Sequence, residues 1–210
     1  MKNNKYQFVS LVGKGEKAFP VDLRSDKHVI REAKSIKKWL NDNNGSFPEP
    51  HITAYAVSHC QVREQGYPFA FFIVNKQFMN KKESSINYSC PDQIIYNPEI
   101  LEKPETVVKD VPAREVSKDD NGNVSYKIVK KRGKVSNQYE VAEACMSFNH
   151  KKDKKVMRCY SIRVKYQTRG FFGRIRTHTE WIEGLKAHIF QHEMDHMEGN
   201  NIYFNSKHKK

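Results

Sequence analysis

The sequence predicts a single-domain α+β protein, and three features of the chain point to this fold class. Apolar residues recur at helical spacing over residues 26–40 and again over 183–197. Between these stretches lie short apolar or alternating segments of the kind that form strands. The chain has 210 residues, enough to bury a core without disulfides, and none of its four cysteines belongs to a C-x-x-C pair.

Local patterns place the expected elements along the chain. An apolar stripe predicts the first helix over 26–40, and Asn41–Gly45 ends it with turn residues. Strands are expected at 6–12, 69–74, 93–96, 162–166 and 174–182. We expect the third of these to end at Asn97-Pro98. The last helix is expected over 183–197, with one face directed toward the core: Leu185, Ile189, His192 and His196.

Residues 101–140 differ from the rest because they mix acids, bases and turn residues. Turn residues at 119–123 precede an alternating segment, which predicts a β-hairpin. Five basic residues crowd its second half: Lys127, Lys130, Lys131, Arg132 and Lys134. They form either a solvated face or a patch that faces RNA phosphates. We therefore predict one domain over 1–210 with a β-hairpin insertion within 101–140.

The charge balance favours anionic surroundings. The formal net charge is +13, which is typical of proteins that meet RNA, the ribosome or acidic peptides. No apolar run approaches the ~20 residues needed to span a bilayer, and the first residues lack the apolar core of a signal peptide. We expect a cytoplasmic protein with no membrane partner.

The string with the clearest chemistry is Gln191-His192-Glu193-Met194-Asp195-His196, inside the last expected helix. His192 and His196 are four residues apart, so both imidazoles project from one helix face and can bind one metal ion. Glu193 stands beside the first of them, where it can act as a general base. A hydrolytic metal site normally has a third protein ligand and one open position. Few residues follow His196, so this ligand is expected from upstream.

A candidate for that ligand lies in Glu143-Ala144-Cys145-Met146-Ser147. Together with Gln191–Gly199, this segment resembles the E-G-C-L-S and Q-H-E-x-D-H-x-x-G motifs of the peptide deformylase family. The family's first motif, G-x-G-L-A-A-x-Q, is represented by Ala54–Gln61, which keeps the glutamine but not the glycines. Ile95–Ile100 is similar to a further family segment that ends in an asparagine-proline-glutamate turn. The resemblance covers most of residues 6–204 except 101–140.

This resemblance implies antiparallel and mixed β-sheets around a central metal-binding helix. It implies that Cys145, His192 and His196 bind one divalent metal ion. Glu193 is then the general acid and base, and Gln61 and the backbone N–H of Met146 donate to the oxyanion. Three further residues are expected at the substrate: Ala56, Glu143 and His188.

The implied activity is removal of the N-formyl group from the N-terminal methionine of newly made polypeptides, with release of formate. Family members use ferrous iron and accept zinc, nickel or cobalt, and the basic surface suggests a ribosome contact. Two alternatives stay open. The chain could be an H-E-x-x-H metallopeptidase with another third ligand, or an inactive deformylase-like protein that binds the ribosome or RNA.

Overall fold

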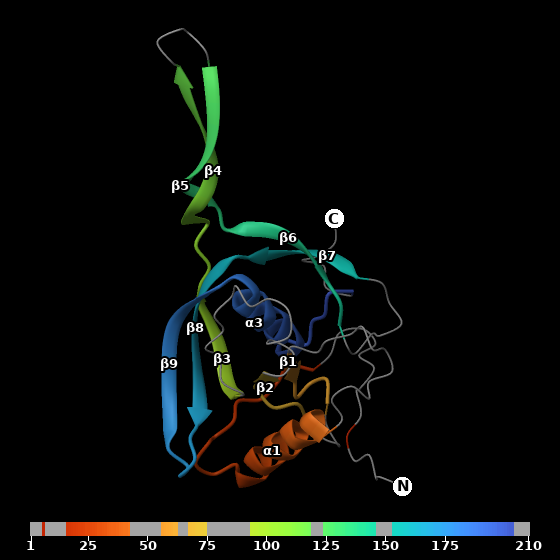
Figure 1. Ribbon diagram of the computed structural model, residues 1–210. Coiled ribbons are helices and arrows are strands. Elements are labelled where there is room, and N and C mark those ends of the chain that lie inside the picture. The colour runs from red at the N-terminus through yellow and green to blue at the C-terminus, as the bar shows by residue number, and fades with distance from the viewer. Residues whose placement is uncertain are drawn as a thin grey trace.

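The computed structural model describes residues 6, 16–42, 56–62, 67–74, 93–118, 124–145 and 153–203. Figure 1 shows a body built from a sheet and two helices, with a long two-stranded arm projecting from it. Apart from Tyr6, the strand expected at 6–12 lies outside the described residues. The described part contains no helix long and apolar enough to cross a membrane.

The body is organised around an antiparallel five-stranded sheet with the order β1-β2-β3-β8-β9. Its strands are β1 (Ala56–Ser58), β2 (Phe71–Val74), β3 (Ile94–Glu102), β8 (Ser161–Arg169) and β9 (Ile175–Glu183). All four strand pairings are antiparallel, and one isolated parallel bridge joins Phe19 to Phe69. The α+β class and the strands expected at 69–74, 162–166 and 174–182 are confirmed.

One helix covers each face of this sheet. On β2, Phe71 and Ile73 pack against α1 (Lys27–Asp42) on one face of the sheet. Phe72 packs against the other helix, on the opposite face. That helix is α3 (Gly184–Met197), which contributes Phe190. Since successive strand residues point to opposite faces, a strand covered on both sides must be apolar throughout. This explains why the whole of β2 is buried.

The expectation that the third strand ends at Asn97-Pro98 is wrong, because β3 continues through this pair to Glu102. The strand passes it by an irregularity in its pairing with β8 between Tyr96 and Glu99. There Asn97 adopts a φ of 48°, and its side chain exchanges two 2.8 Å hydrogen bonds with the backbone of Val21. Proline is compatible with such a bulge because no ladder N–H is needed there.

A smaller sheet lies on the other side of α3 (Figure 1). It pairs β6 (Gln138–Glu143) with β7 (Lys154–Cys159) in antiparallel fashion. Cys145 follows two residues after β6, so this sheet brings Glu143 and Cys145 to the helix that carries the two histidines. α3 is therefore enclosed between the two sheets.

The arm consists of β4 (Thr106–Lys118) and β5 (Val124–Ser136), paired antiparallel along their whole length. It lies within 101–140, where the sequence predicts a hairpin; that this segment is an insertion stays a prediction. Figure 1 shows that it leaves the body, so most of its length has no layer to pack against. Val108, Val116 and Ile128 are accordingly 60–70% exposed.

Candidate metal centre

The helix α3 is fixed at both ends and at its middle. Gly184 begins it with a φ of 59° and donates its N–H to the carbonyl of Tyr160 at 2.8 Å. Gly199, with a φ of 75°, ends it in the left-handed conformation that glycine tolerates. In the middle, the Gln191 amide accepts from the N–H of Cys159 at 3.0 Å and donates to its carbonyl at 2.9 Å. The helix therefore cannot slide relative to β7.

The core-facing side of α3 differs from the expected one. The buried residues are Ala187, Phe190, Gln191, Glu193, His196 and Met197, while Leu185 and Ile189 are only half-buried. The helix carries polar groups all around because two sheets enclose it and one side faces a polar site. A single apolar stripe is therefore a poor guide to its orientation.

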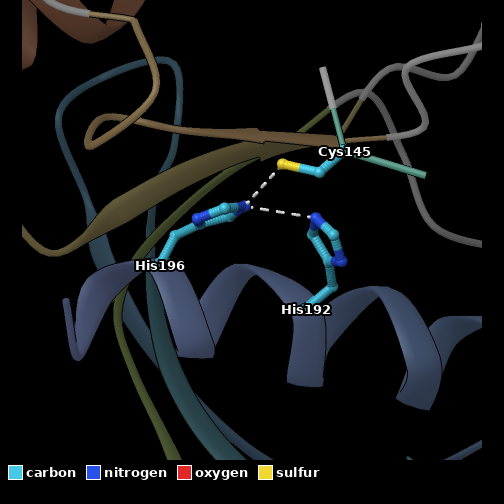
Figure 2. A group of neighbouring side chains, drawn as sticks. All are labelled: Cys145, His192 and His196. Carbon is cyan, nitrogen blue, oxygen red and sulfur yellow. Dashed lines mark hydrogen bonds between the residues drawn. The ribbon is translucent and has the colours of Figure 1, made fainter. Parts of the chain in front are cut away.

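Three potential ligands converge above this helix. The Sγ atom of Cys145 lies 3.3 Å from Nε2 of His196, which in turn lies 3.2 Å from Nε2 of His192. All three donor atoms lie within 4.8 Å of one another. Figure 2 shows both imidazoles rising from α3 on successive turns, with the cysteine sulfur facing them from the chain above. The grouping expected from the sequence is thus present in the fold.

The donor atoms fit a divalent cation. Bonds of ~2.0–2.3 Å from sulfur and imidazole ligands at tetrahedral angles place neighbouring donors roughly 3.3–3.7 Å apart. The observed separations of 3.2 and 3.3 Å are close to that spacing. A set of one thiolate and two imidazoles suits a transition metal rather than Mg²⁺ or Ca²⁺, which prefer oxygen. The ligand types and the separations of the donor atoms both fit a single transition-metal ion.

Neighbouring charges lower the pKa of the Cys145 thiol, which favours the thiolate that a metal ion needs as a ligand. Burial by itself raises the pKa of the Cys145 thiol, but His196 and His192 outweigh it and hold the pKa well below its usual range. Burial likewise lowers the pKa of His192, yet Cys145 and Glu143 hold it well above the usual value. These pKa shifts favour a thiolate on Cys145 beside a protonated His192. A divalent cation can replace that proton, and the thiolate is the form that binds metal.

A buried ionic network orients His192. Its Nδ1 lies 2.8 Å from Oε2 of Glu143, so Nε2 is turned toward the other two donors. Arg158 donates to both oxygens of Glu143, at 2.5 and 2.7 Å, and a third donor of its guanidinium reaches Asp195 at 2.7 Å. Burial raises the pKa of Glu143, but Arg158 and the neighbouring imidazoles hold it far below its usual range. These contacts therefore favour the ionised form of Glu143.

Sequence reasoning missed Arg158 as part of this site. It lies on β7 opposite Tyr139 of β6, and its side chain is 3% exposed. The only signal in the sequence was indirect: Glu143 stands two residues before Cys145, and a carboxylate needs a cationic partner once it is buried. Asp195 stood inside the recognised helix motif but had no expected role.

Glu193 and Gln61 flank the three donors. Glu193 is 2% exposed, and its Oε2 atom has no hydrogen-bond partner among the described residues. Burial raises the pKa of Glu193, against the opposing effect of the two histidines. Gln61 accepts from the backbone N–H of Ser58 at 3.0 Å, which turns its amide nitrogen toward Cys145 Sγ at 3.6 Å. A buried carboxyl group and an N–H donor thus lie close to the three potential ligands.

The family model described as polypeptide deformylase matches residues 17–210. The chain belongs to the polypeptide deformylase family. It is a metal-dependent hydrolase that removes the formyl group from N-formylmethionine, and its family acts on formylated nascent peptides. Family membership together with the upstream cysteine favours this activity over the metallopeptidase alternative.

Solved structures support the same fold for this deformylase. The peptide deformylase of Thermotoga maritima is 22% identical over 94% of this chain and 94% of its own, with a TM-score of 0.52. That of Plasmodium falciparum is 18% identical over 97% and 87%, with a TM-score of 0.53. That of Legionella pneumophila is 20% identical over 93% and 82%, with a TM-score of 0.55. No curated protein matches the chain by sequence.

The remaining expected site residues occupy different positions in this deformylase. Ala56 lies on β1, the edge strand of the described five-stranded sheet. His188 lies one turn before His192, and its Nε2 is 2.6 Å from Oε1 of Glu143. Met146, whose backbone N–H is the second expected oxyanion donor, lies outside the described residues.

Proposed function

We propose that Cys145, His192 and His196 hold one divalent metal ion, and that this ion is ferrous iron in the cell, with zinc, nickel or cobalt as substitutes. The convergence of these three donors beside a buried carboxylate is the observation that carries the proposal. When bound, such an ion supplies Lewis acidity: it makes water acidic enough to act as a nucleophile near neutral pH, and it polarises a formyl oxygen.

Glu193 moves the proton during formyl hydrolysis. Its Oε2 atom is free to accept a proton as water attacks the formyl carbon. The same carboxyl then gives that proton to the amine nitrogen as the C–N bond breaks, leaving formate and a free N-terminus. A raised pKa suits both halves of this transfer, because the carboxyl can hold the proton between the two steps.

Gln61 stabilises the negative charge that develops on the formyl oxygen. Ser58 fixes the amide through its N–H and its hydroxyl, at 3.0 and 3.2 Å, so the N–H₂ group is already directed at the site. A donor held in advance costs no reorganisation when the charge appears. The backbone N–H of Met146 is proposed as the second donor.

The peptide substrate is proposed to bind along β1. This strand is at the edge of the described sheet and carries Ala56, so an extended peptide can add to it through backbone hydrogen bonds. His188 is proposed to line the space for the first side chain of the substrate. Glu143 has both oxygens occupied by Arg158 and the imidazoles, which supports a role in positioning His192 rather than a direct substrate contact.

The activity is tested by loading the protein with iron without air and measuring formate released from a formyl-Met peptide. We expect Glu193→Gln to keep its metal and lose roughly 10²–10⁴-fold in rate, because only the proton transfer is removed. Cys145→Ser should lose the metal, whereas Cys159→Ser, which changes another buried free cysteine, should keep it. No formate from folded, metal-replete protein defeats the proposal.

We also propose that the arm contacts the ribosome in the cytoplasm. It carries eight basic and two acidic residues in β4 and β5, among them Lys130, Lys131 and Arg132 on adjacent positions. Changing these three to Glu should abolish pelleting with ribosomes while short formyl peptides are hydrolysed at the wild-type rate. Unchanged pelleting of the triple variant would exclude the arm as the contact.

A further inference from the structure

A second electropositive feature lies between α1 and the turn that joins β8 to β9, two segments that Figure 1 shows at the end of the body away from the arm. A cleft of about 660 Å³ opens there, and five basic side chains line it: Lys34, Lys37, Arg169, Arg174 and Arg176. No acidic residue is among the described residues that line it. None of the metal-centre residues borders it, so the deformylase reaction leaves this cleft unexplained.

Four of these cations have no carboxylate partner within the described part of the chain: Lys34, Arg169, Arg174 and Arg176. Elsewhere some surface lysines are paired with carboxylates, as Lys38 is with Asp42 at 2.6 Å and Lys155 with Glu140 at 2.9 Å. Unpaired cations crowded around one hollow repel one another, and a bound polyanion relieves that repulsion. The cleft therefore fits a ligand with several negative charges.

The turn itself presents two aromatic rings to solvent. Gly170 and Gly173 close it, with Gly173 N–H donating to the Gly170 carbonyl at 3.0 Å and Gly173 at a φ of 77°. Between them stand Phe171 and Phe172, which are 97% and 95% exposed. Turns favour Gly, Asn, Asp and Ser at such positions, and two exposed phenylalanines add nothing to the core. Their rings stand at 88° to each other, so each keeps a free face.

We propose that this cleft binds a single-stranded RNA segment, whose phosphates lie along the basic side chains and whose unpaired bases stack on Phe171 and Phe172. Proteins that bind single strands combine these two elements: a positive groove for the backbone and aromatic faces for the bases. The cleft also offers polar groups for base edges, from Gln93 and Thr168. A membrane surface would use the phenylalanines and the charges, but it would not need a hollow with polar groups in its wall.

RNA bases stack on aromatic ring faces, whereas a membrane contact needs only apolar surface. Variants that separate these two properties therefore distinguish RNA binding from membrane binding. We compare Phe171→Leu/Phe172→Leu, which keeps apolar bulk, with Phe171→Tyr/Phe172→Tyr, which keeps the aromatic faces. The probe is a fluorescein-labelled oligo(U) RNA of about 12 nucleotides, read by anisotropy with the full chain. We expect the leucine pair to weaken binding roughly tenfold and the tyrosine pair to stay within about twofold of wild type.

Two charge-reversal variants separate the effect of the cleft from the effect of overall net charge. Lys34→Glu/Arg174→Glu/Arg176→Glu alters the cleft, and Lys38→Glu/Lys155→Glu/Lys165→Glu makes the same change in net charge at exposed lysines elsewhere. We expect the cleft variant to lose roughly tenfold or more in affinity and to flatten the slope of log affinity against log salt by roughly 2. The control should change far less. All variants should release formate from short peptides at the wild-type rate, which separates this test from the proposed catalytic roles.

Three results would overturn the proposal. One is the absence of RNA binding by the wild-type chain, and another is equal loss in the two charge-reversal variants. The third concerns vesicles of phosphatidylglycerol and phosphatidylcholine. If the wild-type protein sediments with them, the leucine pair still does, and RNA affinity is indifferent to both phenylalanine pairs, the turn is a membrane contact instead.

Discussion

At the scale of single residues, the site depends on a carboxylate, that of Glu143, which contacts none of the three donor atoms. It acts on the site through the opposite ring nitrogen of His192. Glu143 fixes Nδ1 of that imidazole, and Arg158 keeps the carboxylate ionised inside the protein. Metal-binding histidines commonly depend on such an outer partner, which holds the ring in place and raises its basicity. The geometry of the three donors is therefore maintained from β6 and β7 as well as from α3.

Glu143→Gln tests this role, because it keeps the shape of the side chain and removes its charge. We expect metal affinity to fall roughly 10–100-fold, since the amide holds His192 less firmly and gives Arg158 a poorer partner. The measurement is competition for zinc against a chelator of known affinity. Glu140→Gln, on the same strand but exposed, is the matched control and should bind like wild type. Equal affinities for both variants would contradict the positioning role.

The residue scale was also the one that sequence could predict best. The spacing of His192, Glu193 and His196 is itself a chemical requirement, and the family resemblance implied Cys145. The fold brings Cys145, His192 and His196 together. Arg158 could not be predicted, because its contact with Glu143 depends on the register of β6 against β7. No local pattern in a single sequence specifies that register.

At the scale of elements, β3 shows how one side chain lets a strand continue through an unfavourable pair of residues. Asn97 takes a left-handed backbone conformation that few residues tolerate. Its amide bonds the N–H and carbonyl of Val21 and the side chain of Gln167, each at 2.8 Å. The segment before α1 is thereby attached to the centre of the sheet.

Asn97→Ala should lower the free energy of unfolding by about 2–4 kcal/mol, because three hydrogen bonds are lost and alanine is strained at positive φ. Asn97→Gly loses the same bonds but tolerates the backbone angle, so it should be less damaging than alanine by about 1 kcal/mol. Urea unfolding followed by fluorescence measures both. If the glycine variant is the less stable of the two, the backbone conformation assigned to Asn97 is wrong.

Prediction of helices and strands from the sequence succeeded where a local pattern alone determines the element. It failed where a tertiary contact overrides the local pattern. The apolar stripe of 26–40 predicts α1 well because one face of that helix packs on the sheet and the other meets solvent. The strand at 93–96 was ended too early because Asn-Pro is a turn signal, and only the tertiary contact with Val21 makes it a bulge. Because α3 is enclosed between two sheets, its buried residues do not form one apolar stripe, and the sequence pattern did not predict which side faces the core.

At the scale of the whole molecule, the body and the arm have different physical roles. The body contains the buried clusters and the metal centre, whereas the arm is a two-stranded ribbon whose apolar side chains remain largely exposed. The arm therefore adds charge and reach without adding to the core. The helix α1 and the β8–β9 turn, which border the basic cleft, lie at the end of the molecule opposite the arm in Figure 1, so the two basic features are on different sides of the protein.

Replacing residues 110–132 by a short Gly-containing turn should leave the body folded. We expect the free energy of unfolding to change by no more than about 1 kcal/mol, since little apolar area is removed from the core. Formate release from a short peptide should stay at the wild-type level. Calorimetry and the formate assay check the two expectations. A body that unfolds cooperatively at a much lower temperature would show that the arm is part of the core after all.

The central claim is that one cysteine and two histidines bind a single metal ion. X-ray absorption spectroscopy of the zinc- or iron-loaded protein tests it most directly, because it counts sulfur and nitrogen neighbours without relying on activity. We predict one sulfur at about 2.3 Å and imidazole nitrogens at about 2.0–2.1 Å, with the sulfur signal lost in Cys145→Ser. A first shell without sulfur in the wild-type protein, or one unchanged in that variant, would contradict the claim.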